Sequence, residues 1–167
     1  TADPLPMTIC RTPPRRPAGF SLTELMVALA IIGILAAFAA PTFKNLMLGQ
    51  RIKSASFDIT TALILARSEA LKQNDSVTLT PASGGTEWAK GWTIAGADGA
   101  TLATQGAYDA SITITGPASV VYTRSGRSSS ASAVTLQVAG AVSGSTVSPR
   151  CISVGVTGQP KSVVGSC

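Results

Sequence analysis

The sequence predicts an α+β protein, in which one long N-terminal helix is followed by a small antiparallel β domain. A continuous apolar run, and then apolar residues at three- to four-residue steps, extend to about Gln73. From Ser76 the apolar residues recur at every second position, in short runs separated by Gly, Pro, Ser and Asp. A helix followed by strands is the order typical of α+β domains, so we expect one or two small sheets on the apolar stripe of the helix.

The apolar run extends from Phe20 to Phe43 and contains one charged side chain, Glu24. At about 1.5 Å per residue, a helix of this length reaches about 36 Å, enough to cross a hydrocarbon core of about 30 Å. We therefore expect residues 20–43 to span a membrane. A charge in such a segment usually marks a partner or a pathway, because burying it is costly. A local alternative is a capping box formed by Ser21 and Glu24.

The residues before this run have a different character. Residues 1–19 are rich in proline, carry Arg11, Arg15 and Arg16, and lack an apolar period. We expect them to form a leader that is not part of the fold. The chain begins with Thr, and Met7 is an alternative start.

The helical period continues beyond the apolar run. Pro41 lacks an amide donor and is expected to kink the helix. The pattern after it predicts an amphipathic helix over residues 44–73 that is ended by Asn74 and Asp75. The side chains predicted to face the core are Leu48, Ile52, Ala55, Ile59, Ala62 or Leu63, Ala66 and Ala70.

The remainder, residues 74–167, is predicted to be the β domain. Its period-two runs are rich in Val, Ile and Thr, which favour strands. The predicted strands are Ser76–Thr80, Gly91–Ala95, Ala100–Thr104, Ser111–Thr115, Ser119–Thr123, Ala133–Val138, Cys151–Val156 and Ser162–Val164.

The composition argues against catalysis. The chain has no histidine, which removes histidine-based triads, metal sites and proton relays. It also has no nucleophile elbow, phosphate-binding loop or dinucleotide-binding motif, and no carboxylates clustered at metal-ligand spacing. We therefore expect no enzymatic activity, no cofactor and no metal.

A set of residues in fixed register resembles the type IV pilin signature. Gly19 and Phe20 follow a basic leader, Thr23 and Glu24 stand fourth and fifth after the glycine, and the apolar run ends near Pro41. The resemblance implies a type IV pilin fold. It also implies that a prepilin peptidase cuts between Gly19 and Phe20 and methylates Phe20. Glu24 would then meet the N-terminal amine of a neighbouring subunit and set the assembly register, because a buried carboxylate is tolerable when paired with an ammonium.

Two further segments resemble the minor pilin branch that includes FimT, FimU and GspH. One is Arg67-Ser68-Glu69-Ala70, for which the alternative is a solvated helix face. The other is the Trp-x-x-Gly-Trp step from Trp88 to Trp92, for which the alternative is core packing.

The resemblance implies a location and a set of partners. The subunit would cross the bacterial inner membrane once, with its C-terminal domain in the periplasm, and then enter a pilus or pseudopilus fibre. Its partners would be other pilins or pseudopilins, the prepilin peptidase and the inner membrane. We expect a structural minor pilin or pseudopilin that helps to initiate fibre assembly.

The cysteines fit an exported domain. Cys10 lies in the leader, which leaves Cys151 and Cys167 after cleavage. In an oxidising periplasm such a pair predicts a disulfide that holds the C-terminus, with two unpaired thiols as the alternative.

A second reading is a DNA-binding minor pilin for DNA uptake. Removing the leader leaves a net charge of about +3, a weak indication of an anionic partner. The predicted contacts are Arg124 and Arg127 on a Gly/Ser-rich connector, together with Arg150 and Lys161. DNA-uptake relatives typically carry Gly-Arg-x-Arg in the tail, whereas this chain has Gly-Gln-Pro-Lys at residues 158–161. One charge in place of two weakens phosphate binding.

A third reading is a soluble periplasmic protein. Ala37-Phe38-Ala39 is an A-x-A pattern after an apolar stretch, as at a signal-peptidase site. Glu24 inside the apolar segment and the continued helical period after Pro41 argue against this reading.

Overall fold

The computed structural model describes residues 19–142 and 145–167, without the side chains of residues 38–42. The predicted leader before Gly19 and the side chains of Phe38 and Ala39 in the A-x-A pattern therefore lie outside the described residues. The chain divides into two compact units, Thr1–Ala39 and Ala40–Cys167.

One helix, α1, extends over Leu22–Gln73 and belongs to both units. It begins two residues later than the predicted Phe20, because Ser21 takes the capping position: its Oγ accepts a hydrogen bond from the backbone N–H of Glu24 at 3.2 Å. The helix assignment continues through Pro41. The kink expected there remains a prediction.

The helix ends at Gln73, as the sequence predicts. Asn74 has a φ of 52°, the left-handed conformation that commonly follows a helix and that asparagine tolerates better than most residues. The N–H of Asp75 then donates to the carbonyl of Ala70 at 3.3 Å. The chain thus leaves the helix in a closed hydrogen-bonded turn.

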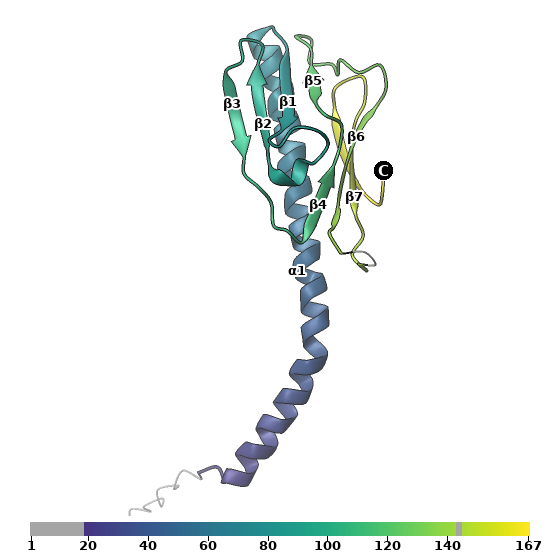
Figure 1. Cartoon of the computed structure of the whole chain (residues 1–167). Helices are drawn as coiled ribbons and strands as arrows, with labels where there is room; N and C mark the ends of the chain where they lie inside the picture. Colours follow the sequence, from purple (N-terminus) through teal and green to yellow (C-terminus); the bar gives the residue numbers. More distant parts are fainter. Residues whose placement is uncertain (1–18, 143–144) are drawn as a thin grey trace, which may run out of the picture. The chain divides into compact units, whose positions relative to one another are not determined.

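Eight strands follow in the described residues, one for each predicted run, with ends shifted by up to two residues. They form two antiparallel sheets with the orders β3-β2-β1-β5 and β4-β6-β7-β8, and Figure 1 shows both beside the second half of α1. The strands are β1 Val77–Pro81, β2 Trp92–Gly96, β3 Thr101–Gln105, β4 Ile112–Thr115, β5 Val120–Tyr122, β6 Val134–Gly140, β7 Arg150–Val154 and β8 Pro160–Val164.

The core lies between the sheets and the stripe of α1 that the sequence predicts. Ile59 and Leu63 on the helix are fully buried, as are Leu79 on β1 and Ile152 on β7. Both Ala62 and Leu63, the two alternatives for one position, are buried. The α+β arrangement expected from the sequence, one long helix followed by antiparallel sheets, is therefore the one observed.

The two tryptophans pack in this core. Trp88 opens a short 3-10 helix, Trp88–Lys90, and its indole N–H donates to the carbonyl of Pro117 at 2.9 Å. Trp92 begins β2 and donates to the hydroxyl of Tyr108 at 3.1 Å. Gly91 between them has a φ of 104°, and a Cβ there would collide with a backbone carbonyl of β3. Core packing explains this motif.

The disulfide prediction is confirmed. Cys151 on β7 is bridged to Cys167, so the C-terminal residue is tied to the sheet. The backbone N–H of Cys167 also donates to the side-chain amide oxygen of Gln137 on β6 at 3.2 Å.

Two polar segments make contacts that the sequence analysis does not include. The Gly/Ser-rich connector after Tyr122 begins with a turn, in which the N–H of Thr123 donates to the carbonyl of Arg127 at 2.9 Å. Arg67, expected on a solvated face, donates from Nε to the carbonyl of Gly126 at 2.9 Å. The turn is a local contact, whereas the bond from Arg67 joins residues far apart along the chain and is not revealed by local sequence.

Candidate assembly interface

The first part of α1 is an apolar helix whose side chains are exposed. Every described side chain from Phe20 to residue 37 is exposed, and Phe20 is 84 % exposed. An apolar helix of this kind is stable only when other apolar groups cover it, in a membrane or against other helices. In the described part of the chain, no helix is long and apolar enough to cross a membrane.

Glu24 is an exposed carboxylate in the first turn of this helix. One half of the predicted capping box is present, because the Glu24 N–H is bonded to Ser21 Oγ. Over residues 19–142 and 145–167, the Glu24 carboxylate itself has neither a hydrogen bond nor an ion pair. The carboxylate can therefore accept a partner from another molecule.

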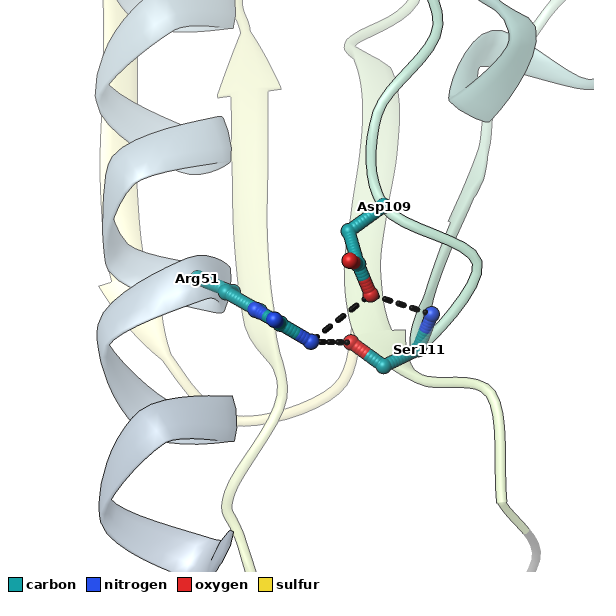
Figure 2. A network of polar contacts seen from close by, with 3 residues as sticks. All are labelled: Arg51, Asp109 and Ser111. Atoms are coloured by element: carbon teal, nitrogen blue, oxygen red, sulfur yellow. Dashed lines mark hydrogen bonds and ion pairs between the residues drawn. The ribbon is translucent and has the colours of Figure 1, made fainter.

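A polar network joins the second part of α1 to the loop before β4. Figure 2 shows Arg51 of α1 reaching Asp109 and Ser111, with 2.7 Å from its Nη1 to Asp109 Oδ1 and 2.9 Å to Ser111 Oγ. Bonds from the Ser111 hydroxyl and N–H, and to a lesser degree the Arg51 charge, lower the pKa of the Asp109 carboxyl below its ordinary value. Both ion-pair partners are nearly half exposed, so the pair contributes little stability and mainly fixes the loop position. The sequence could not reveal a pair so far apart along the chain.

The four basic residues proposed for DNA contact do not form one patch. In the sheet, Lys161 on β8 pairs with Ser153 on β7. The next residue, Ser162, faces the helix, because its hydroxyl bonds to that of Ser56 on α1 at 2.9 Å. Side chains alternate along a strand, so Arg150 lies on the helix-facing side and Lys161 on the outer side.

Arg124 and Arg127 are exposed on the turn after β5. The turn before β8 packs against this loop, since a Cβ on Gly158 would collide with the carbonyl of Gly126. The structure therefore brings the tail turn and the arginine loop together, but it separates Arg150 from Lys161.

The described residues do not suggest a metal centre. They contain no group of three His, Cys, Asp or Glu side chains that could hold an ion. Their polar clusters, such as Arg51 with Asp109 and Ser111, are satisfied structural networks.

The helix and the two-sheet domain define a pilin-type subunit. A family model described as "Prokaryotic N-terminal methylation motif" matches residues 14–40, which include Gly19, Phe20 and Glu24. The family model "Type II transport protein GspH" matches residues 55–158, and the chain belongs to this family.

Solved structures show the same fold. Two crystal forms of the type IV minor pilin FimU from Pseudomonas aeruginosa (strain PAO1) are similar to this chain. One is 23 % identical with a TM-score of 0.59, covering 67 % of this chain and 87 % of that one. The other is 21 % identical with a TM-score of 0.57, covering 66 % and 91 %. No curated protein matches the chain. The family and fold support a structural role in a pilus or pseudopilus, with other pilins and a prepilin peptidase as the partners that they imply.

Proposed function

We propose that this chain is a minor pilin or pseudopilin that helps to initiate a type IV pilus or a type II secretion pseudopilus. A peptidase removes residues 1–19 by cutting between Gly19 and Phe20, and it methylates Phe20. Residues 20–43 then hold the subunit in the bacterial inner membrane, and residues 44–73 support the periplasmic β domain formed by residues 74–167. The subunit leaves the membrane when it joins the fibre.

One observation carries this proposal: an apolar, exposed helix whose single charge, Glu24, has no partner among the described residues. A cluster of such helices would bury the apolar surface, with a gain of about 25 cal/mol per Å² of apolar surface removed from water. A carboxylate among them is tolerable when an ammonium neutralises it. The N-terminal amine of a neighbouring subunit supplies that ammonium, which fixes how far neighbouring helices are offset.

The test is incorporation of Glu24 variants into the fibre. Glu24→Gln keeps the side-chain size and removes the charge, and Glu24→Ala removes both. The control is Glu69→Gln, which alters an acid on the same helix that is already engaged with Lys72 and Gln73. We expect both Glu24 variants to fold and anchor normally but to co-isolate with the fibre several-fold less than the control. Incorporation of Glu24→Gln at the control level would contradict the proposal.

The reading as a soluble periplasmic protein requires instead a mature chain that begins at Ala40 or Pro41. A role in DNA uptake would require the basic residues to contact DNA together. Because Arg150 and Lys161 lie on opposite sides of the sheet, we favour the structural role.

A further inference from the structure

The face of α1 that the sheets leave uncovered has a seven-residue repeat. Positions at alternating three- and four-residue steps extend from Lys53 to Leu71, as in a helix–helix seam. Phe57, Ile64 and Leu71 form the apolar row of this repeat, and they are 71 %, 54 % and 53 % exposed. A row of three large apolar side chains at this spacing matches the requirement for a partner helix.

Two of the three positions in the second row of the repeat are basic. Lys53, Thr60 and Arg67 also recur at seven-residue steps, beside the apolar row. A groove of about 340 Å³ lies here, lined by Lys53, Phe57 and Thr60 from the helix and by Arg150 and Ser162 from β7 and β8. We call the seven-residue repeat with this groove the outer seam.

The positive charge of the outer seam is not neutralised from within the described chain. Neither Lys53 nor Arg150 forms an ion pair there, and Arg67 bonds only to a backbone carbonyl. The two acids of this part of the helix, Asp58 and Glu69, are outside the repeat, and Glu69 is bonded to neighbours on its own helix.

We propose that the outer seam binds an acidic amphipathic helix of a different fibre subunit, an inference that rests on the proposed fibre role. The apolar row would pack against an apolar row of the partner, and Lys53 with Arg150 would face its carboxylates. A second copy of this chain is a poor occupant, because it would oppose Lys53 and Arg67 with the same cations. The outer seam therefore selects a heterologous neighbour by charge.

The test uses the purified full-length chain in lipid nanodiscs and two stapled helical peptides. Both peptides carry a leucine seam, one flanked by glutamates and the other by lysines. We expect the glutamate peptide to bind at least about tenfold more tightly than the lysine peptide. Ile64→Ser should weaken binding of the glutamate peptide about tenfold or more, because it removes an aliphatic side chain that the peptide would bury.

Two further variants separate charge and position. Lys53→Glu should weaken binding of the glutamate peptide several-fold and strengthen binding of the lysine peptide. The matched control is Leu65→Ser, since Leu65 is also apolar and is 38 % exposed but lies outside the repeat. This variant should bind the glutamate peptide as tightly as the unmodified chain does. Tryptophan fluorescence checks that each variant is folded.

Three results would overturn the inference: equal binding of the two peptides, equal weakening by Leu65→Ser and Ile64→Ser, or binding of neither peptide. Because this assay contains no fibre, its failure is distinct from failure of the fibre role. A chain that enters the fibre normally and binds neither peptide would refute the outer seam alone.

Discussion

Replacing Tyr122 with phenylalanine should stabilise the domain. Tyr122 is fully buried, and its hydroxyl is a buried polar atom without a hydrogen-bond partner in the described part of the chain. Leaving such a group unsatisfied costs about 1–3 kcal/mol, so Tyr122→Phe should raise the free energy of unfolding by about 1–2 kcal/mol. The ring and its packing are retained, which limits the change to the oxygen atom.

The same substitution should change stability at high pH. Burial raises the pKa of Tyr122 from 10.0 to about 12. A phenol with a raised folded-state pKa stabilises the fold below the unfolded pKa of about 10, and this contribution is lost as the pH rises toward about 12. Tyr108, the other tyrosine, has its pKa raised to about 12 in the same way by burial. Tyr122→Phe should therefore reduce, but not abolish, the loss of stability above pH 10.

The assay is denaturant unfolding of the full-length protein, followed by the fluorescence of Trp88 and Trp92, which lie in the core. The control is Tyr108→Phe, which removes the acceptor of the 3.1 Å bond from the Trp92 indole and should cost about 1 kcal/mol. Destabilisation by Tyr122→Phe equal to that by Tyr108→Phe would refute the reasoning.

Three other substitutions test the fold. Asp109→Asn should lower the stability of the domain slightly, because it removes the ion pair with Arg51. Since the Asp109 pKa is lowered in the fold, its stabilising contribution is present above the ordinary carboxyl pKa and is lost as the pH falls through the folded value, which unfolding measured against pH would detect. Gly91→Ala should cost at least about 2 kcal/mol in thermal unfolding, because a Cβ at φ 104° would collide with β3; an unchanged melting temperature would contradict this. Replacing Cys151 and Cys167 by serine should lower the free energy of unfolding by about 3 kcal/mol. Equal stability of the unmodified protein with and without reductant would contradict this prediction.

Much of the fold could be predicted because its signals are local. The change of period after Gln73, the Asn74 stop and the runs of β-branched residues each act over a few residues. All eight strands were predicted for this reason, and Cys151 and Cys167 were the two cysteines left after the leader.

The contacts that could not be predicted from the sequence join residues far apart along the chain. Arg51 meets Asp109, and Arg67 meets Gly126, only after both sheets have packed on the helix. The sheet register, which separates Arg150 from Lys161, likewise depends on which strands pair. The sequence carries one further signal, because Phe57 is an apolar residue seven positions before Ile64 and off the core stripe, which is consistent with the outer seam.

The identity of the mature N-terminal residue tests the central claim most directly. Intact-mass and peptide mass spectrometry of the protein isolated from membranes would measure it. The proposed processing predicts a chain that begins with N-methylated Phe20 and retains Glu24. A mature chain that begins at Ala40 would lack the apolar helix and would contradict the account.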